Sequence, residues 1–260
     1  ANKTVTAEAD TLTLLERAQD IAISTDGLFN CTIAPLMDAW GFSSGDYKVP
    51  DAATLNSLLA ALDYSQVAIS GDTVTIPEDV AIDLGGIAKG FTSDRVMKIF
   101  ANNGVTSGII SLGGNVQTLG HKPDGSLWRV GIQDPDDTSS ILATLEVADK
   151  AVITSGGYER YFEEDGQTYW HIMDPETAAP ARSGLKSVTI VSPLGVYCDA
   201  LSTAVFVRGA DWGADFWRTH QDFEMVLVLE DGSLWVTAGL AGSFTLAEDY
   251  QDLEVTVIQL

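Results

Sequence analysis

The sequence predicts an α+β fold in which mixed or antiparallel sheets pack against a few helices. Its second half consists mainly of short apolar runs of strand length, separated by turn residues. Asp-Gly pairs at residues 124–125, 165–166 and 231–232 each lie between two such runs, which is a strong signal for a β-hairpin. Helical patterns interrupt the strands at only a few places, whereas a regular α/β protein would alternate the two. No linker or repeat divides the chain, so we expect a single domain over residues 1–260.

The first part of the chain is expected to hold two helices and a hairpin. Apolar residues at helical spacing predict an amphipathic helix over residues 7–24. A second helix is expected to begin after Pro50, with Asp51 as its N-cap. Residues 66–76 alternate around a central Gly-Asp pair and predict a hairpin.

A glycine-rich stretch at residues 83–95 stands at the centre of the chain. The apolar residues 80–82 predict a strand that ends at Asp83, and the residues after the turn predict a helix that stops at 102–104. Such a turn can present free backbone N–H groups to phosphate oxygens. It matches neither the dinucleotide-binding fingerprint nor the P-loop. A phosphate cradle and an ordinary tight turn are equally good interpretations of this stretch alone.

The second half is predicted to consist of strands, with two helices among them. The helices are expected over residues 196–207 and 210–219. Strands are expected at residues 108–112, 116–119, 127–133, 141–147, 151–154, 158–162, 168–173, 187–191, 225–229, 233–237 and 254–258.

Composition excludes some classes of function. With 37 acidic and 14 basic residues the net charge is −23, and such a surface repels nucleic-acid phosphates and anionic lipids. We therefore expect no nucleic-acid partner, and any anionic ligand would need a metal ion or a local cluster of donors. No apolar stretch is long enough to span a membrane. Cys31 and Cys198 match no metal-binding or redox spacing.

One of the three histidines stands out. His121 lies in a turn and His220 at the end of a predicted helix, so both are expected to be exposed. His171 ends a predicted strand and is followed closely by Asp174. A histidine in that position can act as a general base or proton shuttle, or it can simply cap the loop.

Asp199 and Thr203 form a second candidate pair. They lie four residues apart on a predicted helix, so both side chains project from one face. Carboxylate and hydroxyl oxygens are hard donors of the kind that Mg²⁺ prefers. Because the neighbouring residues are nearly all apolar, Asp199 needs a partner, which could be a metal ion or the start of its own helix.

Several blocks of the sequence, taken in order, closely resemble the ApbE family of FAD:protein FMN transferases. These blocks span nearly the whole chain and comprise residues 25–29, 35–36, 40–42, 83–90, 112–115, 128–132, 154–162, 171–175 and 199–204. The resemblance implies an α+β fold related to the tunnelling fold. It also implies Mg²⁺-dependent cleavage of FAD, with FMN attached through a phosphoester to a Thr or Ser of a target protein and AMP released.

The resemblance also implies roles for individual residues. Asp199 and Thr203 would hold the metal with the backbone carbonyl of Gly86, and His171 would accept the proton of the target hydroxyl. Contacts with FAD are expected from Trp40, Gly41, Phe42, Asp83, Lys89, Ile172 and Met173.

The family's usual setting gives further expectations. The target would belong to a membrane redox complex, and the protein would act as a periplasmic or cell-surface lipoprotein on the extracytoplasmic face of a bacterial membrane. Family members usually begin with a signal or anchor segment and an N-terminal stretch with further FAD contacts, and this chain starts after it, at Ala1. Membrane contact would then depend on an anchor that precedes Ala1.

Two other functions fit the same residues. Water could replace the protein hydroxyl, which would make the protein an FAD pyrophosphatase that yields FMN and AMP. Alternatively, the protein could bind FAD without catalysis. The combination of His171, Asp199 and Thr203 argues against simple binding, because binding alone needs neither a base nor a metal pair.

Overall fold

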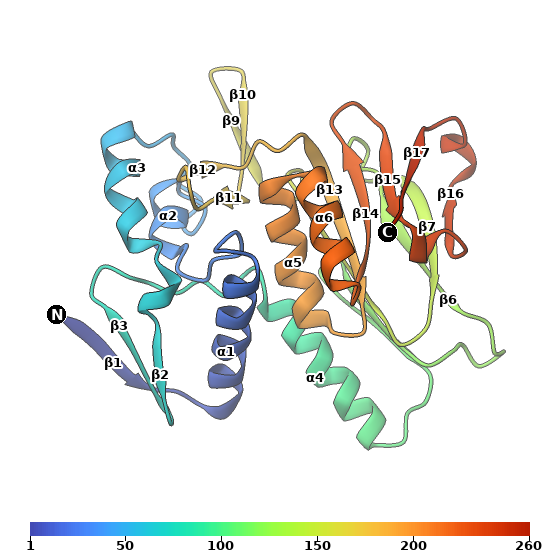
Figure 1. The fold of residues 1–260 in the computed structure, drawn as a ribbon, viewed down its shortest axis with the longest axis horizontal. Coiled ribbons are helices and arrows are strands. Elements are labelled where there is room, and N and C mark those ends of the chain that lie inside the picture. Colours follow the sequence, from blue (N-terminus) through green and yellow to red (C-terminus); the bar gives the residue numbers. More distant parts are fainter.

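The computed structural model of the protein describes residues 1–260 and is organised around one sheet of seven strands. In chain order these strands are β4 (Gly108–Leu112), β5 (Asn115–Leu119), β8 (Ala151–Gly156), β13 (Leu185–Ser192), β14 (Glu224–Leu229), β15 (Leu234–Thr237) and β17 (Val255–Ile258). Their order across the sheet is β17-β15-β14-β13-β8-β5-β4, and only β15 and β17 run parallel to each other. This mixed sheet and its helices confirm the predicted α+β class (Figure 1).

Helices cover one face of this sheet, and a smaller sheet covers the other. The helical layer consists of α4 (Ala88–Asn102), α5 (Gly195–Arg208) and α6 (Ala210–His220), with α1 (Ala9–Ser24) packed on α5. The smaller sheet consists of β6 (Trp128–Gln133), β7 (Ile141–Val147) and β16 (Phe244–Leu246).

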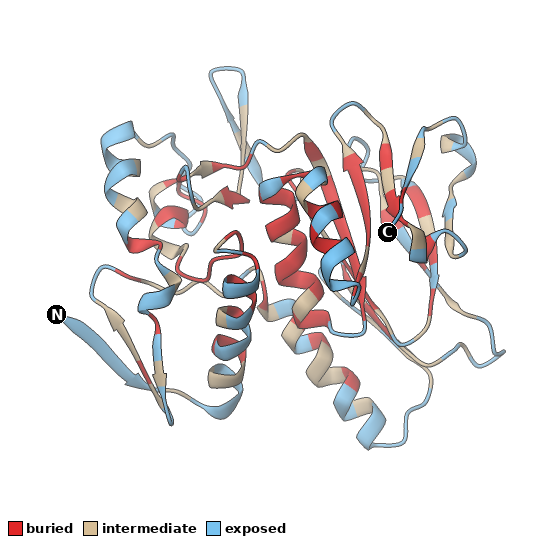
Figure 2. Ribbon diagram, in the orientation of Figure 1, coloured by how far each residue is buried: buried red, intermediate tan, exposed pale blue.

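The strands of the central sheet alternate their side chains between these two layers, as strand geometry requires. In β14, Met225 and Leu227 pack with the helices, whereas Val226 and Val228 pack with the smaller sheet. Helix α5 is buried along almost its whole length, because it lies between the sheet and the other helices (Figure 2).

The N-terminal part of the chain forms a separate layer beside the helices (Figure 1). It contains a sheet of order β1-β3-β2 and four short helices. These elements are β1 (Asn2–Thr6), α2 (Ala34–Ala39), α3 (Ala52–Leu58), η1 (Leu59–Ala61), η2 (Tyr64–Gln66), β2 (Ala68–Ser70) and β3 (Thr73–Pro77). Helix α1, the β2–β3 hairpin and α3 are all predictions that the structure confirms. Asp51 caps α3 as expected, accepting a hydrogen bond from the Thr54 amide at 2.8 Å.

Short elements complete the second half. They are β9 (Tyr161–Glu164), β10 (Gln167–Trp170), β11 (Met173–Asp174), β12 (Ala179–Pro180), η3 (Ala238–Leu240) and η4 (Glu248–Tyr250). The Asp-Gly pairs at 165–166 and 231–232 close the predicted hairpins β9–β10 and β14–β15. The pair at 124–125 does not, because β5 and β6 belong to different sheets. There the chain turns to cross from one layer to the other.

Three predicted strands are also corrected. The strand expected at residues 158–162 begins only at Tyr161, as β9, because residues 157–160 form a turn and a bend. Residues 80–82 form no strand. Val80 is buried in a connecting segment, which accounts for the apolar residue there. The Asp83 amide donates to the Cys31 carbonyl at 2.8 Å, but this hydrogen bond belongs to no sheet. The strand expected at 168–173 divides into β10 and β11, with His171 in the link between them. The sequence does not predict the short strands β1, β12 and β16, the short helix α2, or the 3-10 helices η2, η3 and η4.

Helices α4 and α5 cross at two glycines. A Cβ atom on Gly90 would lie 2.1 Å from the carbonyl oxygen of Gly195, and a Cβ atom on Gly195 would lie 2.7 Å from that of Gly90. Side chains larger than hydrogen are therefore excluded at this crossing. The glycine-rich stretch thus continues into α4, where it serves helix packing and brings the first turns of the two helices together.

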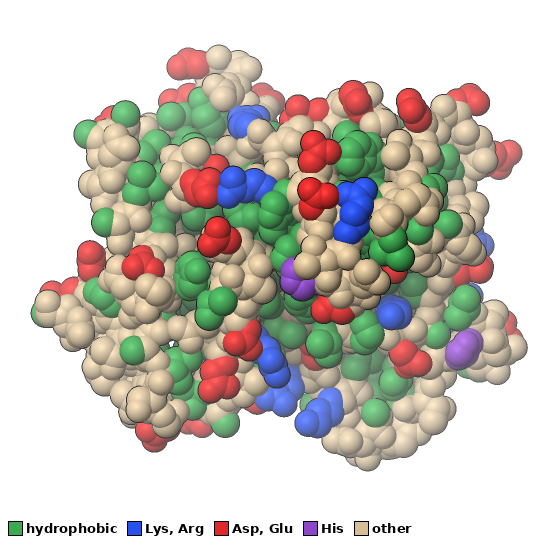
Figure 3. Space-filling model, in the orientation of Figure 1, with side chains coloured by type: hydrophobic (Ala, Val, Ile, Leu, Met, Phe, Trp, Pro, Cys, Tyr) green, Lys and Arg blue, Asp and Glu red, His purple; other side chains and the backbone are tan.

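The surface carries the charge that the composition predicts. Figure 3 shows acidic side chains spread over the visible face, with few basic ones between them. No helix combines the length and the apolar character needed to cross a membrane. Both cysteines are buried and free.

Candidate active site

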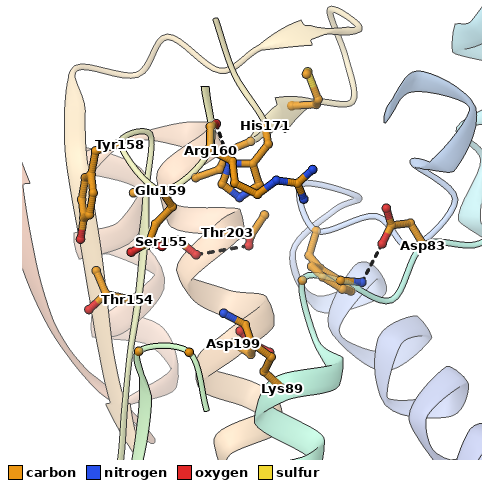
Figure 4. A pocket seen from close by; sticks show the side chains of 18 of the residues that line it. Asp83, Lys89, Thr154, Ser155, Tyr158, Glu159, Arg160, His171, Asp199 and Thr203 are labelled. Atoms are coloured by element: carbon orange, nitrogen blue, oxygen red, sulfur yellow. Dashed lines mark hydrogen bonds between the residues drawn. The ribbon is translucent and has the colours of Figure 1, made fainter. Parts of the chain in front are cut away.

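A cavity of about 590 Å³ lies where the glycine-rich turn, the central sheet and the N-terminal layer meet (Figure 4). Most of the site residues expected from the sequence line it. They are Asp83, Gly86, Lys89, His171, Ile172, Met173, Asp199 and Thr203. The fold thus brings the turn before α4, one face of α5 and the β10–β11 link to a single place.

Asp199 lies on α5 and accepts hydrogen bonds from the start of α4. One carboxylate oxygen accepts from the Gly90 amide at 2.8 Å, and the other from the Asn115 side chain at 2.9 Å. Helix α4 has no side-chain cap of its own, since the residue before it is Ile87. Burial raises the pKa of the Asp199 carboxyl, and its hydrogen bonds offset only part of that shift. Asp199 is therefore a desolvated carboxylate that faces a cavity, which is a suitable position for a bound cation.

Thr203 and Gly86 lie next to each other in this corner of the cavity. A Cβ atom on Gly86 would lie 3.7 Å from Thr203 Oγ1, so the turn and the hydroxyl are neighbours. Ser155 Oγ lies 3.5 Å from the same hydroxyl and 2.8 Å from that of Ser202. No three or more His, Cys, Asp or Glu side chains are grouped so that they could hold a metal ion. A metal ion here would instead be held by one carboxylate with hydroxyl and carbonyl oxygens, a donor set that fits Mg²⁺ when the substrate supplies phosphate oxygens.

His171 is held by the backbone of Arg160. The Arg160 carbonyl oxygen accepts from the His171 amide at 3.0 Å and lies 3.2 Å from its Nδ1. Because a carbonyl can only accept, this contact places the proton on Nδ1 and leaves Nε2 free to accept one. Burial lowers the pKa of His171 to about 4, and the positive charges of Arg160 and Lys89 act in the same direction. The imidazole is therefore neutral at neutral pH and able to act as a base. His121 and His220 are exposed, as predicted.

The glycine-rich turn is not the amide-lined phosphate cradle considered above. The Gly85 amide donates to the Asp83 carboxylate at 2.6 Å, and the Gly90 amide donates to Asp199. Carboxylates of the protein thus use N–H groups that a phosphate would have needed. The side chains of Asp83 and Lys89 line the cavity, as expected for contacts with a ligand.

Trp40, Gly41 and Phe42, which are expected to contact FAD, do not line this cavity. Trp40 and Phe42 are each only 2% exposed and belong to a separate hydrophobic cluster. The indole N–H of Trp40 donates to the Ala178 carbonyl at 3.0 Å. The local sequence does not show this burial, because the residues that cover the two rings, such as Phe162, are distant along the chain.

Other residues of the site were not singled out from the sequence. Asn115 orients Asp199, Ser155 contacts Thr203, and Arg160 holds His171 through its backbone. The glycine pair before Asn115 and residues 154–156 also line the cavity. Each lies inside one of the blocks that resemble the ApbE family, and that position was the available signal.

The fold and the cavity first define a class of protein. One cavity of this α+β protein contains a neutral histidine, a desolvated carboxylate with nearby hydroxyl oxygens, and two basic side chains. This combination of groups is typical of a phosphoryl-transfer enzyme. The comparisons with known proteins then give the family. Residues 1–227 match the ApbE family, and the chain belongs to that family.

Its relatives agree with this assignment. A protein of Klebsiella pneumoniae named FAD:protein FMN transferase is 31% identical over 97% of this chain and 79% of its own length. A Treponema pallidum protein of the same name is 34% identical over 87% of this chain and 67% of its own.

Solved structures show the same fold. The ApbE protein of Thermotoga maritima superposes with a TM-score of 0.83 and 32% identity, over 97% of this chain and 80% of its own. The apo flavinyl transferase ApbE of Pseudomonas stutzeri superposes with a TM-score of 0.79 and 27% identity. The match covers 97% of this chain and 77% of that chain.

Proposed function

We propose that this protein cleaves FAD and attaches its FMN part to a Thr or Ser hydroxyl of a target protein, with Mg²⁺ as the metal and AMP as the second product. The family and the names of its relatives support flavin transfer. The observation that carries the proposal for this chain is that His171, Asp199 and Thr203 line the same cavity.

In this reaction the bond from the target oxygen to the FMN phosphorus forms, and the bond from that phosphorus to the AMP oxygen breaks. His171 Nε2 takes the proton of the target hydroxyl, which becomes the nucleophile. The Arg160 carbonyl keeps the imidazole in the tautomer and orientation that this step needs. Lys89 lies at the cavity to balance phosphate charge.

Asp199 and Thr203, with the Gly86 carbonyl, are the residues that would hold Mg²⁺. When bound there, the ion neutralises negative charge on the phosphate oxygens. Asn115 fixes one Asp199 oxygen and the Gly90 amide fixes the other, so the carboxylate is oriented before any ion arrives.

Mass spectrometry of a peptide acceptor tests this proposal. The protein is incubated with FAD, Mg²⁺ and a flavinylation-site peptide, and we expect the peptide to gain the mass of FMN. A matched peptide with Ala in place of the acceptor Thr should gain none. Absence of the gain with the full-length enzyme would refute the transferase function. AMP release without any peptide would instead indicate FAD hydrolysis, and unchanged FAD would indicate simple binding.

We also propose that the target belongs to a membrane redox complex and that the protein acts on the extracytoplasmic face of a bacterial membrane. Only the family resemblance supports this location. Fractionation of cells that express the complete gene, with detection of the protein and of flavin-labelled targets, tests it. Protein confined to the cytoplasm would contradict it.

A further inference from the structure

We propose that Arg160 is a binding residue for the diphosphate group of the substrate and that it acts together with Lys89. This inference rests on the proposed function, because it names the residue that recognises the diphosphate of FAD. None of the sequence-based expectations included it.

The first observation concerns charge. Lys89 and Arg160 are the two basic side chains that line the cavity, and neither forms an ion pair with a carboxylate. Asp83, Glu159 and Asp199 also line it, yet none approaches either cation within 4.0 Å. In a protein with 37 acidic and 14 basic residues, two free cations in one cavity indicate a site for an anion.

The second observation is that the guanidinium of Arg160 is fixed in place. One of its nitrogens donates to the backbone carbonyl of Phe42, and its central carbon lies 5.9 Å from the centre of the Phe42 ring. Phe42 is itself buried, so the carbonyl and the ring that contact Arg160 belong to a packed cluster. A guanidinium has five N–H donors in a planar fork, and this contact leaves most of them for phosphate oxygens.

The Trp40-Gly41-Phe42 block gains a role through this contact. Gly41 has a φ of +81°, and a Cβ atom there would lie 2.1 Å from the Asp46 carbonyl oxygen. Only glycine fits this turn, which presents the Phe42 carbonyl to Arg160. The block therefore supports the ligand site indirectly, through Arg160, although its own side chains do not reach the cavity.

The third observation links Arg160 to catalysis. Its carbonyl oxygen accepts from the backbone and the ring of His171, so one residue positions the base and presents a cation beside it (Figure 4). A diphosphate bound by the Arg160 side chain would consequently lie next to His171. That is where the FMN phosphorus must be when the target hydroxyl loses its proton.

Titration with inorganic pyrophosphate in the presence of EDTA tests the proposal, by calorimetry or by phosphorus NMR. We expect Arg160→Gln to raise the dissociation constant for pyrophosphate about tenfold, since a charge-assisted bidentate contact is lost. Arg160→Lys keeps the charge but loses the fork and should raise it about threefold. Arg17→Gln removes the same charge from the exposed face of α1, and its effect should stay below about twofold.

The outcomes separate this inference from the proposed function. Pyrophosphate binding that is absent in the wild type, or unchanged in folded Arg160→Gln, would overturn the inference. If Arg160→Gln fails to fold, equal affinity of Arg160→Lys and wild type would overturn it. A wild type that binds pyrophosphate in an Arg160-dependent way but transfers no FMN would overturn only the proposed function.

Discussion

The first turns of α4 and α5 lie against each other, and each is capped by a carboxylate from the other helix. Asp94 of α4 accepts from the amides of Gly195 and Val196 at 2.7 and 2.9 Å, and from the Gln117 side chain at 2.9 Å. Asp199 of α5 accepts from Gly90 of α4. Neither helix has a side-chain cap from its own N-cap residue. The two helices thus cap each other, which explains why they must approach so closely.

The two capping carboxylates differ in their hydrogen-bond donors and in their position relative to the cavity. The Asp94 carboxylate is satisfied by three donors and does not line the cavity that Asp199 faces. Asp199 has one backbone and one side-chain donor, is more deeply buried, and faces the cavity. The same type of contact therefore serves stability at Asp94 and prepares a ligand site at Asp199. Proteins often keep such incompletely satisfied polar groups where function needs them.

Asp199→Asn should have the largest effect on activity. The amide keeps a group of the same shape but removes the charge that would hold the metal, so FMN transfer should fall roughly 10⁴-fold. The melting temperature in EDTA should stay the same or rise, because a desolvated charge is removed. Calorimetry should show that Mg²⁺ no longer stabilises the variant. Activity within tenfold of the wild type would contradict the metal role.

His171→Ala removes the base on the opposite side of the cavity from the helix caps. The rate of transfer should fall about 10²–10⁴-fold, whereas binding of Mg²⁺ should persist because Asp199 and Thr203 are intact. His121→Ala, in an exposed turn, is the matched control and should leave the rate unchanged. Equal losses in the two variants would rule out a specific role for His171.

Asp94→Ala should lower stability and leave activity nearly unchanged, the reverse of the effects expected for Asp199→Asn. Loss of the cap of α5 should lower the free energy of unfolding by about 1–3 kcal/mol, as measured by urea denaturation. Transfer per folded molecule should stay within about threefold of the wild type, because the side chain contacts no part of the cavity. Retained stability with lost activity would show that the two carboxylates do not divide their roles as described.

Sequence reasoning found one of these two carboxylates and not the other. Asp199 was recognised because a charged residue among apolar ones is visible locally, and the Gly-rich stretch before α4 is visible for the same reason. The trans cap by Asp94 was not predictable, because it joins residues about a hundred positions apart. The same limit applies to Trp40 and Phe42, whose burial depends on distant residues of β9 and β10.

The fold class could be predicted because it depends on patterns that are local in the sequence. Strand and helix periodicity is local, and it placed most elements of the central sheet correctly. The pairing of strands is not local, so the Asp-Gly pair before β6 predicted a hairpin where the chain changes sheets. Val80 showed the same weakness, since its apolar character reflects burial in a connection and not membership of a sheet.

The pH dependence of transfer tests the protonation state of His171. With its pKa lowered to about 4, His171 is neutral above that pH and can accept a proton. The value of kcat/KM should therefore be nearly constant above pH 5 and fall about tenfold per unit below pH 4. An acid limb near the ordinary histidine value would contradict an imidazole that partial burial keeps neutral.

The pH dependence of folding stability should also report on His171, with stability decreasing as the pH falls. Because the unfolded chain binds a proton at His171 near its ordinary pKa of about 6.5 and the folded chain does so only near 4, stability is lost as pH falls through this window. His171→Ala should remove that part of the pH dependence of the melting temperature, while Asp94→Ala should keep it. Identical pH dependence of stability in wild type and His171→Ala would show that the ring is solvated, and the argument for a base held ready by the Arg160 carbonyl would then fail.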